Sequence, residues 1–475
     1  AARGSTGRDH LAALAGKCLA QAGALAASER AQLAAAGRDI LAAAWCAEPL
    51  SCDLGLLLSG LRGPDLPPPP EAMRPVLAAL PRHWRVPPGD DPWHGLARSE
   101  ACEALPGLMS REPGNLFWKA QAWSLAWPTG QWSLAEAALA QGQWPRALAP
   151  LRLHAQALLR LAQDRAEEAL FLLEALGGFF PGGAPNLRAE CLLRLGRVEE
   201  AAILLAETVL AAPWRTSELL RLDDILRGVD RLFAPVPGGV AILLYTWNKA
   251  RELDETLASL AASDLQGAGI WVLDNGSSDA TPEVIERWGG VLGSRMKALR
   301  LPVNIGAPAA RNWLLSLPEV RSGEFIVFSD DDVSLPSDWL GRLGAAAVLA
   351  PQAQVWGCRV VDEANPLVSQ SVDYTPLAPR PAHEPSQLMH LPSMHLRQPD
   401  LGQFSYLRPC ISVTGCCHML RAADIDAAGG FDIRFSPSQY DDLERDLRVF
   451  LSGGRVVYQG HLCVRHKRRS GVAAE

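Results

Sequence analysis

The segment EFIVFSDDD, residues 324–332, leads from apolar, strand-forming residues directly into three consecutive carboxylates. Three similar runs of apolar and β-branched residues precede it: VAILLYTW (240–247), GIWVLDN (269–275) and KALRLP (297–302). Stretches with helical spacing follow the four runs, after Lys249, Thr281, Ala307 and Pro336. Strands and helices that alternate at this interval predict an α/β fold, with a mostly parallel sheet between two layers of helices.

Polar residues stand at the end of each predicted strand, where parallel sheets bind their ligands. They are Thr246, Trp247 and Asn248 after the first strand, Asp274 and Asn275 after the second, Asn304 and Gly306 after the third, and Asp330, Asp331 and Asp332 after the fourth. Taken alone, the stretch 274–277 is typical of a tight turn, and the stretch 304–312 of a glycine turn before a helix. The order and spacing of the whole series instead indicate one ligand site.

The segment from about 238 to 470 resembles glycosyltransferase family 2, inverting enzymes of the GT-A fold that use nucleotide-diphospho-sugar donors. Four blocks carry the resemblance, in the family's order: LLYTWNK (243–249), LDNGSSD (273–279), NIGAPAARN (304–312) and FSDDDVSLPSDWL (328–340). The resemblance implies that Thr246 and Asp274 line the nucleoside pocket and that Arg311 faces the donor. The family's second acid in the LDNGSSD block is Asn275 here, which keeps hydrogen bonding and removes a charge.

Asp330 and Asp332 form a D-x-D pattern at the end of a strand. A sugar nucleotide leaves as a diphosphate, and a hard divalent cation held by carboxylates neutralises the charge that builds on its oxygens. We therefore expect Mn2+ or Mg2+ at Asp332, with Asp330 as a further ligand and Asp331 on the donor side. Two alternatives stay open, namely an acidic surface turn and the phosphatase signature of the haloacid dehalogenase class, which D-x-D followed by Ser334 also fits.

The segments VTGCCHMLR (413–421) and GGFDIRFSPSQYDDLERDLR (429–448) resemble the acceptor side of the same family. An inverting transfer needs a carboxylate that takes the proton of the acceptor hydroxyl as its oxygen attacks the anomeric carbon. Asp442 is the predicted base. Its neighbour Asp441 is the alternative, because the acidic pair departs from the family's Glu-Asp. Both acids would also suit a helix N-terminus without any catalytic role.

His466 follows the last strand-like run, RVVYQGHLCV (455–464). The family resemblance implies that it is a metal ligand, a common role for imidazole. Together with the basic residues at positions 465 and 467–469, it would equally suit a basic tail that contacts the pyrophosphate or an anionic membrane surface. His461 is the weaker candidate for a metal ligand.

The Pro-rich stretch 365–409 contains His383, His390 and His395 without a clear period. Long segments of this kind in compact domains are often binding loops. We therefore interpret the stretch as a loop that covers the acceptor. A metal site built from the three histidines is the weaker interpretation, because no carboxylate or cysteine spacing supports it.

Residues 1–234 are rich in Ala and Leu at helical spacing, which predicts an all-helical domain with a break near 63–115. The segment NLRAECLLRLGRVEEAAILLAETVLAAP (186–213) predicts two short helices around Leu195 and Gly196 and resembles a tetratricopeptide unit. An irregular helical bundle is the alternative, because the period is not steady. A linker at 233–239 separates this domain, a candidate for protein docking, from the predicted transferase domain at 238–475.

The composition, with 48% hydrophobic and 20% charged residues, is that of a globular protein. A net charge of -7 provides no basic field for nucleic acid. The ten cysteines lack C-x-x-C spacing and indicate buried thiols of a reducing compartment. No window resembles a membrane span, and the start lacks the apolar core of a signal peptide. We expect a cytoplasmic location with at most peripheral contact to the inner face of the membrane.

The sequence thus predicts an inverting glycosyltransferase with a UDP, GDP or dTDP sugar as donor and a hydroxyl of a saccharide, lipid-linked glycan or protein as acceptor. The alternative is a catalytically silent nucleotide-sugar-binding scaffold that acts through its helical repeats. Asn275 and the altered acidic pair keep this alternative open. Donor base, acceptor and linkage depend on loop shapes that the sequence does not specify.

Overall fold

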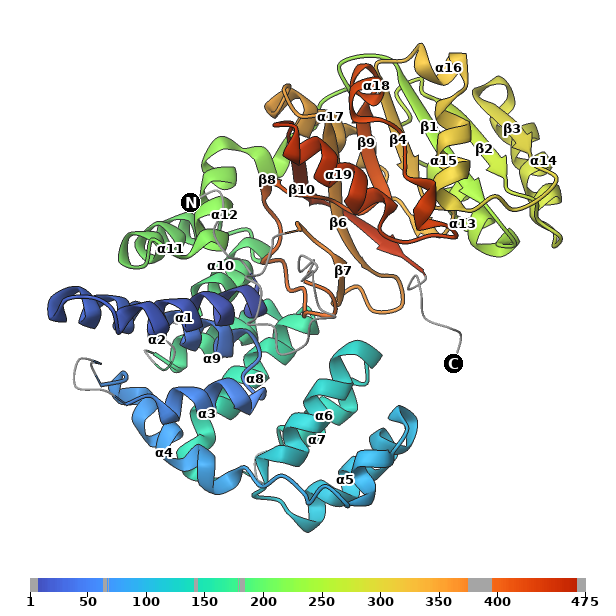
Figure 1. Ribbon diagram of the computed structural model, residues 1–475. Coiled ribbons are helices and arrows are strands. Elements are labelled where there is room, and N and C mark those ends of the chain that lie inside the picture. The colour runs from blue at the N-terminus through green and yellow to red at the C-terminus, as the bar shows by residue number, and fades with distance from the viewer. Residues whose placement is uncertain are drawn as a thin grey trace.

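The structure is a computed structural model that describes residues 7–62, 66, 68–140, 144–177, 179, 184–374 and 395–467. A helical N-terminal region is followed by a C-terminal region built on one sheet (Figure 1). None of the helices in the described ranges is both long and apolar enough to cross a membrane.

The N-terminal region consists of helices that pack on one shared apolar core. They are α1 (Arg8–Ala22), α2 (Ala27–Ala47), α3 (Cys52–Gly60), α4 (Arg74–His83), α5 (Arg98–Arg111), α6 (Leu116–Thr129), α7 (Trp132–Ala138), α8 (Ala149–Ala162), α9 (Ala166–Ala175), α10 (Pro185–Arg194), α11 (Val198–Ala211) and α12 (Thr216–Arg227). Small residues let neighbouring helices approach closely. A Cβ atom on Gly55 of α3 would lie only 2.6 Å from Leu80 Cδ2 of α4.

Three of the turns between consecutive helices share one geometry. Gly130, Asp164 and Gly196 end α6, α8 and α10 in the left-handed conformation, with φ of 67°, 59° and 73°. In each case the next amide donates to the carbonyl five residues before it. The predicted helix pair around Leu195 and Gly196 is confirmed, and similar hairpins recur at intervals of 34 and 32 residues. The tetratricopeptide relationship stays a prediction.

The C-terminal region is organised around a mixed, mostly parallel sheet with the strand order β3-β2-β1-β4-β9-β6-β10-β5. Its strands are β1 (Val240–Thr246), β2 (Gly269–Asp274), β3 (Met296–Arg300), β4 (Phe325–Ser329), β5 (Val333–Ser334), β6 (Val355–Asp362), β7 (Ser369–Ser371), β8 (Leu407–Cys410), β9 (Cys417–Arg421) and β10 (Val456–His466). Strands β1 to β4 pair in parallel, whereas β9 runs antiparallel between β4 and β6. This arrangement confirms the predicted fold class.

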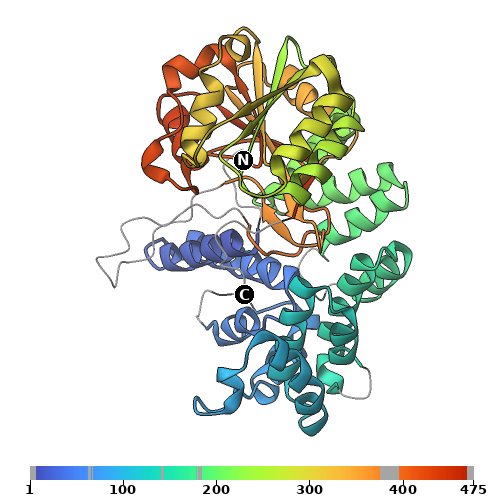
Figure 2. The ribbon, with the colours of Figure 1, turned by 90° about the vertical axis from the view of Figure 1, so that its right-hand side faces the viewer.

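Helices cover both faces of the sheet (Figure 2). They are α13 (Ala250–Ala261), α14 (Thr281–Leu292), α15 (Ala307–Leu315), α16 (Pro318–Arg321), α17 (Trp339–Leu349), α18 (Ile425–Ala428) and α19 (Asp441–Leu451). Alternate residues of β1 enter different cores, because successive side chains of a strand point to opposite faces. Ile242 packs into the core under α13, α14 and α17, and Leu243 into the core under α15, α18 and α19.

The two regions are in direct contact. Asp224 of α12 accepts hydrogen bonds from the Leu407 amide and from His461 Nε2, both at 2.7 Å. The Ser217 hydroxyl donates to the Gln403 carbonyl at 2.8 Å, and Leu401 is buried in the helical core. The predicted linker also packs closely, since Ala234 donates its amide to the Gly341 carbonyl of α17. The division into domains at 234 and 238 stays a prediction.

Candidate active site

The carboxyl ends of β2, β1 and β4 lie side by side at one edge of the sheet. Thr246 at the end of β1 stands opposite Asp274 at the end of β2. Strand β1 also pairs with β4, and Asp330 comes directly after β4. The structure therefore brings the polar ends of these three strands together, at the place where open α/β sheets bind ligands.

Asp274 is buried at this edge and shapes the turn that follows β2. Its Oδ1 accepts a hydrogen bond from the Ser277 amide at 2.8 Å. Its Oδ2 lies 3.3 Å from Arg300 Nε but has no hydrogen-bond partner of good geometry among the described residues. Buried polar atoms are normally hydrogen-bonded, so this oxygen is suited to accept a bond from a ligand.

Asn275 and Asn304 join the turns after β2 and β3. Asn275 Nδ2 donates to Asn304 Oδ1 at 2.9 Å, and Asn275 Oδ1 accepts from the Ile305 amide at 3.1 Å. Asn304 Oδ1 also accepts from the Gly306 amide at 2.8 Å. The amide of Asn275 thus holds the two turns together, whereas a carboxylate at this position would add a charge.

The turn after β2 requires a glycine at its centre. Gly276 has a φ of 80°, and a Cβ atom there would lie 2.6 Å from the Val303 carbonyl carbon. On the other side of this turn, the Ser278 amide donates to Asn248 Oδ1 at 2.8 Å. Trp247, next to Asn248, is 49% exposed. An exposed indole at the end of β1 offers a surface for a flat ring.

Two of the three carboxylates after β4 share a lysine that the sequence pattern did not mark as a site residue. Lys249 Nζ lies 2.9 Å from Asp331 Oδ1 and 2.8 Å from Asp332 Oδ2. Burial alone would lower the pKa of Lys249, but the two carboxylates raise it above its ordinary value. Burial raises the pKa of Asp331, against the charge of Lys249. Lys249 is therefore a charged internal partner of this cluster.

His466, the last residue of β10, contacts the same cluster. Its Nε2 lies 2.8 Å from Asp332 Oδ1 and 3.9 Å from Asp330 Oδ2, and its Nδ1 lies 2.7 Å from Gln370 Oε1. Burial would raise the pKa of Asp332, but the hydrogen bond and charge of His466, together with Lys249, hold it well below its ordinary value. Burial would lower the pKa of His466, yet Asp332 and Asp330 raise it.

Arg311 connects the two acidic segments that the sequence analysis assigned to donor and acceptor sides. Its Nη1 lies 2.7 Å from Asp441 Oδ2, and its Nη2 lies 3.5 Å from Asp330 Oδ1. The guanidinium is buried against aromatic rings, 5.3 Å from the centre of Tyr245 and 5.1 Å from that of Phe431. Burial raises the pKa of Asp330 to about 6, although Arg311 and His466 act in the opposite direction.

Asp441 and Asp442 begin α19 and have different surroundings. Asp441 is ion-paired with Arg311, whereas Asp442 accepts hydrogen bonds from two backbone amides, Gly415 at 2.6 Å and Leu443 at 2.7 Å. In the described ranges, no cationic side chain lies within ion-pair distance of Asp442. Burial raises the pKa of Asp442, which Arg311 lowers and Asp441 raises further.

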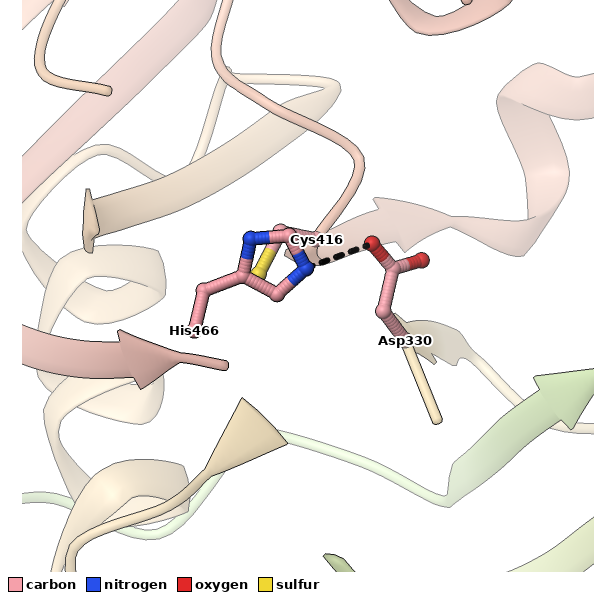
Figure 3. Close-up of side chains that lie close together, drawn as sticks. All are labelled: Asp330, Cys416 and His466. Carbon is pink, nitrogen blue, oxygen red and sulfur yellow. Dashed lines mark ion pairs between the residues drawn. The ribbon is translucent and has the colours of Figure 1, made fainter. Parts of the chain in front are cut away.

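A cysteine, also absent from the sequence analysis as a site residue, lies beside the carboxylate cluster. One ligand atom each from Asp330, Cys416 and His466 lie within 4.8 Å of one another (Figure 3). These three residues come from the end of β4, the start of β9 and the end of β10. The antiparallel register of β4 and β9, which pairs Ser329 with Cys417, is the feature that would have revealed Cys416.

The remaining histidine candidates have other partners. His461 pairs with Asp224 of the helical region at 2.7 Å, and His395 is buried 3.5 Å from Asp373. His383 and His390 lie outside the described residues, as do Arg468 and Arg469. In the described parts of the stretch 365–409, β7 pairs with β6, β8 pairs with β10, and the segment before β8 contacts the helical region.

Comparison with known families identifies the C-terminal region. Residues 241–424 match the family model described as glycosyl transferase family 2. The match includes Thr246, Asp274, Asp330 and Cys416 and ends before Asp442. The D-x-D pattern of residues 330–332 lies within the matched segment.

One relative is the O-antigen biosynthesis protein RfbC of Myxococcus xanthus, 28% identical over 192 residues, which are 40% of this chain and 14% of RfbC. Similar solved structures include S. aureus TarS, at 19% identity and a TM-score of 0.35, over 48% of this chain and 37% of TarS. They also include the mannosyltransferase PcManGT from Pyrobaculum calidifontis in complex with GDP-Man and Mn2+, at 17% identity and a TM-score of 0.35, over 57% of this chain and 68% of that one.

Proposed function

Because residues 241–424 match the glycosyl transferase family 2 model, we propose that the protein transfers a sugar from a nucleotide diphosphate to an acceptor hydroxyl with inversion at the anomeric carbon. One observation carries the proposal. Arg311 holds the acidic cluster after β4 and the acidic start of α19 together, with contacts to Asp330 and to Asp441. A cation-binding group and a candidate base are thereby adjacent at one sheet edge.

The donor nucleoside binds beside Asp274 in this proposal. Oδ2 of this buried carboxylate, which lies 3.3 Å from Arg300 Nε but has no hydrogen-bond partner among the described residues, accepts a hydrogen bond from the base. Thr246 lines the same pocket, and Trp247 and Asn248 form its outer wall with the turns of Asn275, Asn304 and Gly306. UDP, GDP and dTDP sugars are the donor classes to test, since each base presents N–H groups to a carboxylate.

A divalent cation, Mn2+ or Mg2+, fits the residues after β4. Asp330, Asp332 and His466 would hold it, and Asp331 with Lys249 would face the phosphates. The carboxylates of residues 330–332, 441 and 442 outnumber the permanent cations Lys249 and Arg311 that contact them. When bound, the cation supplies positive charge to the departing diphosphate.

Asp442 is the proposed base. Its carboxylate is held by the Gly415 and Leu443 amides, and burial raises its pKa, which makes it a better proton acceptor at neutral pH. It removes the proton of the acceptor hydroxyl as that oxygen attacks the anomeric carbon. Asp441 keeps Arg311 in place and has a positioning role.

The acceptor and the partners belong to the same proposal. RfbC is by name an O-antigen biosynthesis protein, so we favour a saccharide or lipid-linked saccharide acceptor over a protein. The helical region, with its recurring hairpins, serves as a protein-docking module. We place the protein in the cytoplasm, with peripheral membrane contact where the acceptor is lipid-linked.

Calorimetric titration with UDP, GDP and dTDP, each with and without Mn2+, tests the proposal. We expect metal-dependent binding of one nucleotide, loss of this binding in Asp332→Ala, and unchanged binding in Asp426→Asn, a control at an exposed acid of α18. If none of the nucleotides binds, either with or without Mn2+, the transferase proposal fails.

A further inference from the structure

We infer that the cation centre of this protein includes a sulfur ligand, the thiolate of Cys416, beside Asp330 and His466 (Figure 3). The inference rests on the proposed function in so far as a divalent cation binds at this edge of the sheet. It adds that the centre prefers cations that accept sulfur, such as Zn2+ and Co2+, over Mg2+, which takes oxygen ligands.

Main-chain hydrogen bonds fix the three ligand-bearing residues. Asp330 follows β4 and Cys416 precedes β9, and the Asp330 amide donates to the Cys416 carbonyl at 2.8 Å. His466 pairs with Val333 of β5, just after the carboxylate cluster. The Lys467 amide then donates to the Asp332 carbonyl at 2.9 Å. The ligand positions are therefore set by the sheet rather than by a loop.

The separations suit a shared cation. The ligand atoms of Asp330, Cys416 and His466 lie within 4.8 Å of one another. Ligand atoms around one tetrahedral Zn2+ are roughly 3.3 to 3.8 Å apart, given metal–ligand distances of about 2.0 to 2.3 Å. To share a tetrahedral cation, the ligand atoms that are farthest apart would have to approach by roughly 1 Å. Cys416 and His466 are buried, and the Asp330 side chain is 22% exposed, which leaves the centre open on the carboxylate side.

The imidazole is oriented as in metal sites. His466 Nδ1 lies 2.7 Å from Gln370 Oε1, so a proton on Nδ1 is held there and Nε2 points to the cluster. A hydrogen bond of this kind fixes the ring of a metal-binding histidine. Gln370 is itself held, because its Nε2 donates to Asp362 Oδ2 at 3.2 Å and to the His466 carbonyl at 3.1 Å.

Asp332 is less available than Asp330 as the carboxylate ligand. Both of its oxygens are engaged, Oδ2 with Lys249 Nζ and Oδ1 with His466 Nε2, each at 2.8 Å. The ion pairs of Asp330 are longer, with Oδ1 at 3.5 Å from Arg311 Nη2 and Oδ2 at 3.9 Å from His466 Nε2. A carboxylate oxygen of Asp330 and the thiol of Cys416 thus lie near the same histidine.

Cys416 differs from the other thiols of the sheet. Cys417, the next residue, lies in the strand, and its carbonyl accepts from Cys358 Sγ. Cys463 lies on β10, the strand of His466, three residues away from it. Cys416 Sγ instead lies within 4.8 Å of ligand atoms of a carboxylate and an imidazole. A thiol with these neighbours can act as a metal ligand, whereas most buried cysteines only pack in the core.

Cation binding exchanges a proton for the metal. The S–H bond of Cys416 breaks, a bond forms between Sγ and the cation, and the proton passes to the solvent. His466 Nε2 likewise releases its proton when it binds the cation. No oxidant or reductant takes part.

Titration of the metal-free full-length chain with Co2+, followed by near-ultraviolet absorption, tests the inference. Thiolate-bound Co2+ gives an intense charge-transfer band, which carboxylate and imidazole ligands do not give. We expect this band to saturate at one Co2+ per chain, to be absent in Cys416→Ser, and to persist in the matched control Cys463→Ser. Competition with Zn2+ should show affinity weakened about 100-fold in Cys416→Ser, at the upper end of losses seen when the surroundings of metal ligands are altered.

The inference is overturned if the wild type gives no band, or if Cys416→Ser gives the same band with an unchanged thermal unfolding curve. Its failure is distinct from failure of the proposed function. Metal-dependent nucleotide binding without a charge-transfer band would retain the transferase and remove the thiolate. A saturating charge-transfer band without nucleotide binding would retain the thiolate ligand and remove the transferase.

Discussion

The acidic segment after β4 and the acidic start of α19 lie on either side of Arg311, yet their carboxylates differ in partners. Asp331 and Asp332 contact Lys249, and Asp330 and Asp332 contact His466. At the start of α19, Asp441 forms an ion pair with the Arg311 guanidinium, whereas Asp442 accepts hydrogen bonds from backbone amides. The same residue type therefore has two environments within one site.

The difference separates two chemical roles. Asp332, which contacts both Lys249 and His466, is stabilised as an anion, as its lowered pKa indicates, and an anionic carboxylate can hold a cation. Burial raises the pKa values of Asp330 and Asp331 in spite of their cationic neighbours. Asp442 has a raised pKa because burial is not offset by an ion pair, which favours proton transfer. The sequence could not decide which of Asp441 and Asp442 is the better candidate for the base. The ion pair of Arg311 with Asp441 distinguishes them.

The largest expected effect comes from removing the proposed base. Asp442→Asn keeps an oxygen to accept from the Gly415 amide but cannot take a proton. We expect the rate of nucleoside diphosphate release in the presence of acceptor to fall about 10²- to 10⁴-fold, the usual contribution of a general base. Nucleotide affinity should stay within a factor of about two, since ground-state contacts are unaltered.

Asp441→Asn is the matched comparison for that variant, because it alters the neighbouring acid of the same helix turn. It should lower the rate less than Asp442→Asn does and should lower the melting temperature more. If the two variants lose activity equally with equal stability, the distinction between base and positioning acid is wrong.

The next largest effect concerns the link between the two segments. Arg311→Met leaves the carboxylates of Asp441 and Asp330 without their shared cation. Breaking a buried ion pair on one side costs about 3–5 kcal/mol, and we expect a loss of this size in the free energy of unfolding by denaturant. Arg434→Met removes the cation of an exposed pair with Asp432 and should leave the unfolding curve unchanged. Equal curves for wild type and Arg311→Met would show that the link contributes nothing.

Much of the fold was accessible from the sequence because the buried strands β1, β2 and β4 form continuous apolar runs, whereas β3 is largely exposed. The four runs that end at Thr246, Asp274, Arg300 and Ser329 became β1 to β4. The antiparallel β9 was not predicted. Its neighbours β4 and β6 are fixed by tertiary pairing, which local periodicity does not encode.

The site was predicted only in part, for a related reason. The residues after β1, β2 and β4 follow from the strand pattern alone. Lys249 was overlooked because its ammonium meets Asp331 and Asp332 only through the turn after β1. Cys416 was overlooked because its nearness to Asp330 depends on the register of β4 with β9. Contacts that depend on the pairing of distant segments require the structure.

A smaller effect is expected from the lysine that neutralises the cluster after β4. Lys249→Met removes a cation from Asp331 and Asp332, so the cluster becomes more negative. In the absence of nucleotide, Mn2+ should bind roughly tenfold more tightly, the equivalent of about 1.4 kcal/mol. The concentration of Mn2+ that gives half of the maximal thermal shift measures this change. Unchanged or weaker Mn2+ binding would mean that Lys249 does not compete with the cation.

The smallest effect concerns Asp446, one helix turn after Asp442. It accepts hydrogen bonds from the Ser412 hydroxyl at 2.8 Å and the Val413 amide at 3.0 Å, and burial raises its pKa to about 7. Between its ordinary pKa near 4 and this value, the folded protein keeps a proton that the unfolded chain has released. Raising the pH through this window therefore lowers the free energy of unfolding.

The side chain of Asn in Asp446→Asn cannot ionise, so the free energy of unfolding of this variant should not fall with pH for this reason. We expect the melting temperature of this variant, relative to wild type, to rise by about 2–4 °C between pH 5.5 and pH 8, the shift that 1 kcal/mol produces in a domain of this size. Exposed Asp426→Asn should show no such trend. If the difference between Asp446→Asn and wild type is the same at both pH values, Asp446 is ionised in the folded protein, and the contrast between paired and unpaired carboxylates does not extend along α19.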